Sequence, residues 1–122
     1  MDNETTISDL RRKVEKFRDD REWLKFHTPK DLSMALSIES AELEELFLWN
    51  DDKSVGRMLQ NRTKLQQVKD EVADIEIYLL SLSSVLHMDL SDAVYDKLTQ
   101  NARKYPVEKS KGSSRKYNEL PA

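Results

Sequence analysis

Two pairs of acidic residues have the types and spacing that point most directly to chemistry. Glu39 and Glu42 form a Glu-x-x-Glu pair, and Glu71 and Asp74 form a Glu-x-x-Asp pair. At about 100° per residue on a helix, Glu39 falls in the middle of one apolar face and Glu71 inside another, whereas Glu42 and Asp74 lie toward the edges. A carboxylate in an apolar face is unfavourable unless it is paired, protonated or bound to a metal. We therefore predict that the two pairs converge on a cation.

Only oxygen ligands are available in these pairs, because neither contains His and the chain has no Cys. Such a ligand set favours Mg²⁺, with Mn²⁺ as an alternative, over Zn²⁺ or Cu²⁺. Two other interpretations stay open at this stage. Buried ion pairs with Lys or Arg could neutralise the acids. A di-iron carboxylate bundle would use similar helices, although it usually has Glu-x-x-His motifs.

A basic stripe near the end of the last predicted helix could neutralise phosphate oxygens. Lys97, Asn101 and Lys104 follow one another at spacings of four and three, and Tyr105 is adjacent. Cationic and amide side chains beside a metal cluster stabilise phosphate oxygens. The alternative is a solvated basic turn that complements the helix dipole.

Three further residues could contact a nucleobase. Trp49 and Tyr78 flank the acidic pairs on their helices, where an aromatic ring can stack on a base. His27 precedes the second predicted helix, where it could bond to a base edge. Core packing is the alternative for the aromatic residues, and an ordinary loop position is the alternative for His27. Glu45, one turn beyond Glu42, could orient a water molecule.

Helices must position these residues, because the composition argues against a sheet. The 122 residues are 38% apolar and 35% charged and include only two Gly and three Pro, which are too few turn residues for a sandwich or barrel. Capping signals and apolar residues at helical spacing predict helices at 7–25, 29–49, 63–87 and 91–104, with a short turn at 55–59.

The predicted helices define an all-α fold. Four helices with short connections make a four-helix bundle protomer, and its apolar faces are wide enough to predict an oligomeric helical core. We predict one catalytic helical domain over residues 1–106. The tail over 107–122 has little apolar content and is predicted to be extended or mobile.

The charge and hydropathy pattern narrows the range of partners. A net charge of −3 implies no strong field for a nucleic-acid polymer or a membrane surface. No apolar run reaches the roughly 18 residues of a membrane-spanning helix. The first ten residues are polar and lack the apolar segment of a secretory signal. We expect a cytoplasmic protein.

The acidic motifs and their surroundings resemble a known family. Glu39-Ser40-Ala41-Glu42 and Glu71-Val72-Ala73-Asp74, separated by residues 43–70, resemble the metal site of the all-α nucleoside triphosphate pyrophosphohydrolase superfamily, the MazG-like group. The dCTP pyrophosphatase branch is the most similar, as judged from the stretches 26–29, 41–49, 74–79, 97–106 and 111–117.

The resemblance implies an enzyme that uses Mg²⁺ to hydrolyse a (d)NTP to the (d)NMP and pyrophosphate. The substrate expected is dCTP or a modified dCTP, the role is nucleotide-pool cleansing, and the assembly is a homodimer or homotetramer. Glu39, Glu42, Glu71 and Asp74 become metal ligands. The base and sugar pocket would include His27, Trp49 and Tyr78, and the phosphate-side group Lys97, Asn101, Lys104 and Tyr105. The rival functions are a non-catalytic helical oligomerisation module and a nucleotide-binding regulatory module.

Overall fold

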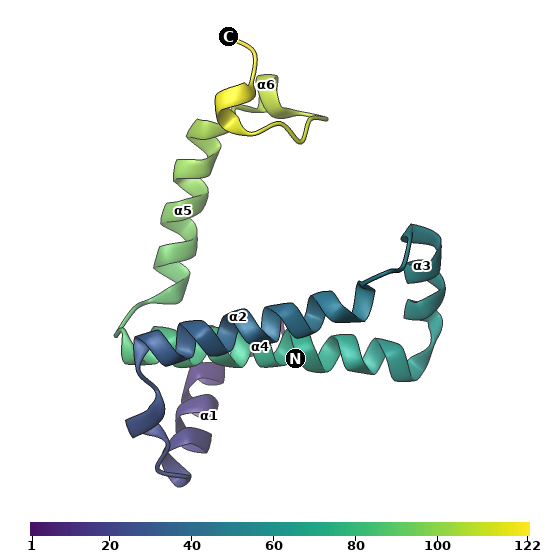
Figure 1. Ribbon diagram of the computed structural model, residues 1–122. Helices are drawn as coiled ribbons and strands as arrows, with labels where there is room; N and C mark the ends of the chain where they lie inside the picture. The colour runs from purple at the N-terminus through teal and green to yellow at the C-terminus, as the bar shows by residue number, and fades with distance from the viewer. The chain divides into compact units, whose positions relative to one another are not determined.

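The computed structural model describes every residue, Met1–Ala122, and contains helices but no strand. The all-α prediction is confirmed. The four long helices predicted correspond to α1, α2, α4 and α5, and two shorter α-helices and two 3₁₀ turns are added to them. In chain order the elements are α1 (Ile7–Asp20), η1 (Leu24–Phe26), α2 (Pro29–Phe47), α3 (Asp52–Gln60), α4 (Arg62–Val85), α5 (Leu90–Lys104), α6 (Val107–Ser110) and η2 (Tyr117–Glu119) (Figure 1).

The helices begin where the capping residues place them. Thr6 and Asp9 form a capping box, in which each side chain accepts a hydrogen bond from the other residue's backbone N–H, at 3.0 and 2.9 Å. Thr28 caps α2, and its Oγ1 accepts from the backbone N–H of Asp31 at 3.1 Å. Asp89 caps α5 in the same way. These contacts satisfy N–H groups that have no partner within the helix.

The first helix is shorter than predicted, because it ends at Asp20 rather than near Lys25. Glu22 adopts a left-handed backbone conformation with a φ of 53°. The Trp23 N–H donates to the Arg18 carbonyl at 3.1 Å, and the Glu22 N–H donates to the Asp19 carbonyl at 3.0 Å. This is a Schellman motif, which usually has Gly at the left-handed position. Because Glu22 stands there instead of Gly, no residue type marks the end of the helix.

The loop after α2 also differs from its prediction. The short turn expected at 55–59 is the nine-residue helix α3, which begins after the capping residue Asp51. Asn61 then ends α3 and caps α4, with its Oδ1 accepting from the Lys64 N–H at 3.1 Å. Because α3 and α4 share one capping residue, α3 leads directly into α4, and residues 48–51 form the irregular part of the connection between α2 and α4.

By its contacts the chain divides into two units, Met1–Met88 and Asp89–Ala122. In the first unit, α4 is the central helix and contacts α1, α2 and α3. Helices α2 and α4 run antiparallel, side by side (Figure 1). None of the helices is both long enough and apolar enough to cross a lipid bilayer.

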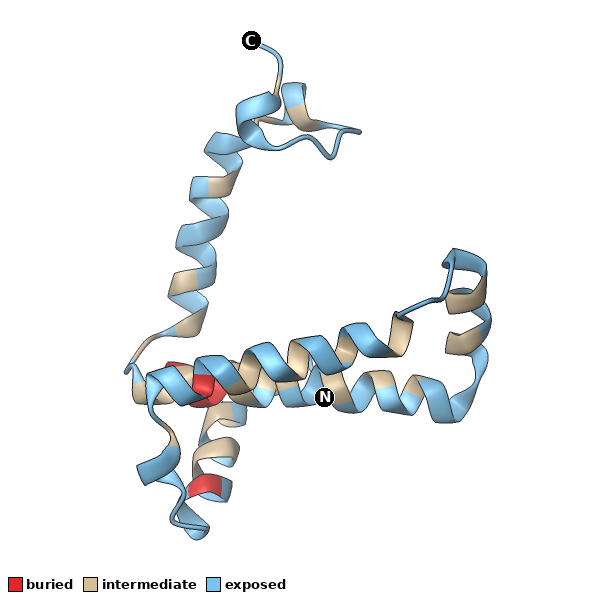
Figure 2. Ribbon diagram, in the orientation of Figure 1, coloured by how far each residue is buried: buried red, intermediate tan, exposed pale blue.

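Few side chains are fully buried in the first unit. They are Arg18, Leu32, Leu80, Ser81 and Ser83, and Figure 2 shows them in red on α1, the start of α2 and the second half of α4. Other apolar residues of this region remain outside the core, because Val72 on α4 and Leu86 at its end stay 52% and 48% exposed.

The second unit consists of α5, α6 and η2. The rings of Tyr105 and Tyr117 meet edge to face with centroids 6.2 Å apart. The Lys104 ammonium lies 5.0 Å from the centroid of the Tyr117 ring. Residues 107–122 therefore fold back on the end of α5 through Tyr117, and their two short helical turns are joined by irregular backbone.

Candidate functional site

Helices α2 and α4 bring three of the four predicted metal ligands together. Glu39, Glu42 and Glu71 each offer a carboxylate oxygen, and these oxygens lie within 4.8 Å of one another. Asp74 lies outside this cluster but lines the adjacent cavity together with Glu39. Glu39 and Glu71 are half-buried, whereas Glu42 and Asp74 are exposed. This is the same division into deep and shallow ligands that the helical spacing predicts.

Two of these carboxylates have buried oxygens with no partner. The Oε2 atoms of Glu39 and Glu71 are shielded from solvent and have no hydrogen-bond partner in the protein. None of the ion pairs of the protein includes any of the four acids. Within this chain, therefore, no Lys or Arg forms an ion pair with the four acids. Buried, unpartnered carboxylate oxygens on facing helices are the donor set that a hard divalent cation requires.

The proximity of the acids changes their protonation. Burial, the adjoining carboxyl of Glu71 and the charge of Glu42 raise the pKa of Glu39 to about 7. Burial and the charges of Glu39, Asp74 and Glu42 also raise the pKa of Tyr78, so its phenol stays neutral. The cluster thus holds a proton near neutral pH when no other cation replaces it.

A cavity of about 320 Å³ opens beside Glu39 and Asp74. Helices α1, α2 and α4 and the turn between α1 and α2 supply its walls. The lining residues are Val14, Phe17, Arg18, Trp23, His27, Glu39, Asp74, Ile77, Tyr78 and Ser81. Three aromatic rings, a guanidinium and an imidazole make a wall of this kind suitable for a planar, polar-edged ligand such as a nucleobase.

His27 is a polar group of this wall. Its Nδ1 is buried and has no hydrogen-bond partner in the protein. Burial first, and then the positive charge of Arg18, lower the pKa of His27. The imidazole is therefore neutral at pH 7, and it offers an unused hydrogen-bonding atom to whatever occupies the cavity.

Several predicted site residues lie elsewhere. Trp49 follows the end of α2, has a φ of 66° and is 94% exposed, so the assumption that it continues the helical face of Glu42 is wrong. Glu45 is exposed on α2. The phosphate-side group is in the second unit, where Asn101 is half-buried and Lys97, Lys104 and Tyr105 are exposed. The roles of all of these residues stay predictions.

Besides the predicted site residues, Val14, Phe17, Arg18, Trp23, Ile77 and Ser81 line the cavity. Arg18 could have been found, because it follows Val14 by four residues and thus falls on the apolar face of α1. Trp23 could not, because the Schellman motif after Asp20 reverses the chain there.

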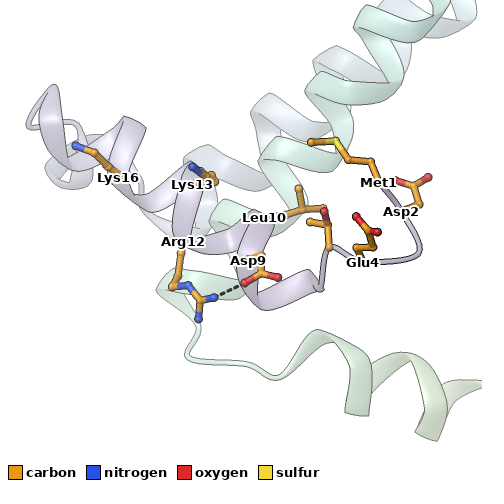
Figure 3. Close-up of a pocket in the computed structure, with 9 residues that line it drawn as sticks. Met1, Asp2, Glu4, Asp9, Leu10, Arg12, Lys13 and Lys16 are labelled. Carbon is orange, nitrogen blue, oxygen red and sulfur yellow. Dashed lines mark hydrogen bonds and ion pairs between the residues drawn. The ribbon is translucent and has the colours of Figure 1, made fainter.

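A second cavity of about 570 Å³ lies between the first residues of the chain and α1 (Figure 3). Both acidic and basic side chains line it, and Arg12 forms an ion pair with Asp9. None of the predicted site residues lines it. The carboxylate cluster and the smaller cavity next to it therefore remain the candidate site.

Comparison with known proteins identifies the family. The sequence model of the MazG-like family matches residues 34–120. The chain belongs to the MazG-like family. It is 39% identical to dCTP pyrophosphatase 1 of Homo sapiens over 97% of this chain and 69% of that protein. With the Bos taurus protein of the same name it shares 40% identity over 98% of this chain and 70% of the relative.

A solved structure that is similar to this chain is also that of a pyrophosphatase. The chain matches the crystal structure of a pyrophosphatase from Archaeoglobus fulgidus with a TM-score of 0.75 and 42% identity, over 81% of this chain and 91% of the other. The predicted family, the all-α fold and the prediction of a hydrolase of the dCTP diphosphatase-like kind are confirmed. The family match covers α4 and most of α2, and thus both acidic pairs.

Proposed function

We propose that this MazG-like enzyme hydrolyses dCTP, or a dCTP with a modified base, to dCMP and pyrophosphate with the help of Mg²⁺. The observation that carries the proposal is the cluster of Glu39, Glu42 and Glu71, with two buried unpartnered oxygens, beside a cavity walled by aromatic rings. The relatives named dCTP pyrophosphatase 1 support the choice of nucleotide. Removal of unwanted cytosine nucleotides from the nucleotide pool is the corresponding role.

The acidic residues of the site would bind the metal ion. Glu39, Glu42 and Glu71 would hold the cation, and Asp74 extends this set toward the cavity. A bound Mg²⁺ supplies charge neutralisation for phosphate oxygens and activation of water. Mn²⁺ fits the same oxygen ligands.

The cavity would enclose the nucleoside. Trp23, Phe17 and Tyr78 offer aromatic surface for the base, and Trp49 stays a further candidate from its sequence position. His27 presents its unpartnered Nδ1 to the base edge. Enclosing the base fixes the nucleotide relative to the carboxylates, which accounts for a large part of the rate advantage of an enzyme.

The remaining predicted residues would act on the triphosphate. We propose that Lys97, Asn101, Lys104 and Tyr105 bind phosphate oxygens and stabilise the charge that develops on them. Glu45 would orient the attacking water as a hydrogen-bond acceptor. Attack at the α-phosphorus places the water oxygen on dCMP and releases pyrophosphate without a covalent enzyme intermediate.

The test is a panel of the four dNTPs with Mg²⁺ in ¹⁸O-water. We expect dCTP to be the best substrate, pyrophosphate to be released, and the label to appear in dCMP. Release of orthophosphate, label in pyrophosphate, or no turnover of any triphosphate would contradict the proposal. Calorimetry with Mg²⁺ and a nucleotide then separates the rivals, because a regulatory module binds without turnover and an oligomerisation module gives no heat of binding.

A matched pair of variants assigns the site. Glu71→Gln keeps the shape of the side chain but removes its charge, so we expect a loss of at least about 100-fold in kcat/KM. Glu44→Gln makes the same change at an exposed position on α2 and should leave kcat/KM unchanged. Equal activity of the two variants would show that the carboxylate cluster is not the active site.

A further inference from the structure

Arg18 is an unusual residue for the wall of a small cavity. Only 8% of the residue is exposed, and it is the single buried residue of α1. It lines the 320 Å³ cavity together with His27 and Tyr78. A guanidinium stays charged at every accessible pH, so burying it is unfavourable unless each donor finds a partner.

Two of its three nitrogens are held in place. Nε donates to Oδ1 of Asp19 at 2.8 Å. Nη1 donates to Oγ of Ser84 on α4 at 3.1 Å, and that hydroxyl donates in turn to Oε1 of Glu15 at 2.7 Å. These contacts fix the orientation of the planar fork.

The third nitrogen, Nη2, makes no hydrogen bond or ion pair within the protein. Asp19, the one carboxylate in ion-pair contact with Arg18, is bonded to Nε instead. Neither Glu39 nor Asp74, the two acids of the cavity, pairs with the guanidinium. The guanidinium is thus anchored through Nε and Nη1, and the N–H donors of Nη2 are unused in a residue that lines the cavity.

We propose that Arg18 determines base specificity by donating from Nη2 to the acceptor edge of cytosine. The inference rests on the proposed function, because it assumes that the cavity holds the base. Nη2 has two N–H donors and no acceptor. Cytosine presents two adjacent acceptors, O2 and N3, whereas thymine and uracil carry an N3–H donor that a guanidinium opposes.

The contact has a chemical consequence for modified bases. O2 and N3 lie on the side of the ring away from C5, so Arg18 does not sense a substituent at C5. It discriminates cytosine from thymine and uracil and accepts 5-methylcytosine as readily as cytosine.

The test compares two arginines of α1. Arg18→Met keeps an unbranched apolar stem and removes the donors. Arg11→Met is the matched control, because Arg11 is half-buried, donates to the Met88 carbonyl at 3.2 Å and does not line the cavity. Calorimetry with the monophosphates dCMP, 5-methyl-dCMP and dTMP measures affinity without any hydrolysis. Steady-state assays with dCTP and dTTP in Mg²⁺ supply KM and kcat.

We expect Arg18→Met to weaken dCMP and 5-methyl-dCMP equally, by roughly 10- to 100-fold, the range of a hydrogen bond to a charged donor. Affinity for dTMP should change less than about threefold, so the preference for cytosine is lost and the effect on dCTP appears mainly in KM. Arg11→Met should lower the melting temperature while keeping the preference. An unchanged ratio of dCMP to dTMP affinity in folded Arg18→Met overturns the inference.

Two further outcomes keep the inference separate from the proposed function. If no triphosphate is hydrolysed but dCMP binding depends on Arg18, the proposed activity fails and the inference stands. If Arg18→Met does not fold, the test uses Arg18→Lys, because the single nitrogen of an ammonium lacks the planar fork whose separate nitrogens bond to Asp19 and Ser84 and leave Nη2 for a base. A ratio of dCMP to dTMP affinity reduced at least about fivefold in Arg18→Lys supports the inference, and a smaller change overturns it.

Discussion

At the scale of single residues, Glu39 illustrates how position changes an ordinary carboxyl group. It lies in the apolar face of α2, opposite Glu71, and its buried Oε2 has no partner. Its raised pKa, about 7, follows from burial and from the neighbouring acids Glu71, Glu42 and Asp74. A proton and a divalent cation therefore compete for the same oxygens near neutral pH.

This competition predicts how stability depends on pH without metal. The pKa of Glu39 is raised in the folded protein from 4.5 to about 7. Its contribution to the free energy of unfolding is therefore fully present below about pH 4.5 and is lost as the pH rises through 7. Urea unfolding in EDTA should show this loss mainly between about pH 4.5 and 7.

The titration of His27 changes the free energy of unfolding in the opposite direction, so its contribution must be separated from that of Glu39. Because its pKa is lowered in the folded protein from 6.5, its contribution is present above pH 6.5 and is lost as the pH falls. The informative quantity is the difference between the protein and Glu39→Gln, which keeps His27. The same pH dependence in both proteins would contradict the assignment to Glu39.

Mg²⁺ binding should show the reverse pH dependence. Raising the pH from 6 to 8 removes the proton that Glu39 holds, so the affinity for Mg²⁺ should rise, by up to about tenfold per pH unit below the pKa. Titration calorimetry in two buffers with different ionisation enthalpies would detect the proton released. An affinity that stays constant from pH 6 to 8 would mean that Glu39 is not a ligand.

At the scale of elements, α1 and α4 end in the same type of C-terminal cap. Both helices end in a Schellman motif with a left-handed residue that is not Gly, Glu22 after α1 and His87 after α4. The turn at Glu22 reverses the chain and sets the Trp23 ring against Phe17, with centroids 5.8 Å apart. Both rings then line the cavity beside the carboxylates.

The left-handed conformation of Glu22 predicts a stabilising substitution. An L-residue in this conformation is disfavoured by roughly 1–2 kcal/mol relative to its right-handed form, and Gly avoids that term. Since Gly loses more backbone entropy on folding, we expect Glu22→Gly to raise the free energy of unfolding by about 0.5–1 kcal/mol. Chemical denaturation measures the change.

Two controls accompany this substitution. Glu44→Gly, on the exposed face of α2, should destabilise the protein by about 1 kcal/mol, because Gly is a poor helix former. Glu22→Val should also destabilise it, since a β-branched residue tolerates a positive φ poorly. A less stable Glu22→Gly variant would show that the Glu22 side chain contributes more than its backbone strain removes.

The sequence predicted the parts of the fold that local chemistry determines. The caps Thr6 and Thr28 and the inward placement of Glu39 and Glu71 follow from residue type and helical period. The end of α1 could not be predicted in this way, because Glu22 occupies the left-handed position at which a Gly would have indicated the end of the helix. The cavity did not follow either, since Trp23 reaches it through tertiary packing and a chain reversal that no periodicity describes.

At the scale of the whole molecule, one chain leaves much of its apolar surface uncovered. Only Leu32 and Leu80 are buried hydrophobic residues. On α2, Met34 and Ile38 are 56% and 59% exposed. At about 100° per residue, Glu42 lies on the same side of α2 as these two residues. A partner that covers this side would also remove Glu42 from water.

We therefore predict that the protein is a homodimer or homotetramer with this side of α2 at an interface. Ile38→Glu places a charge on it and should shift the mass measured by light scattering toward the monomer. Ser33→Glu adds the same charge about 140° around the helix and should leave the mass unchanged. The Ile38→Glu monomer should also bind Mg²⁺ more weakly, because a hydrated Glu42 holds a cation less well. A wild-type protein that is monomeric at micromolar concentration would contradict the prediction. An Ile38→Glu protein that keeps its mass would place the interface elsewhere on the first unit.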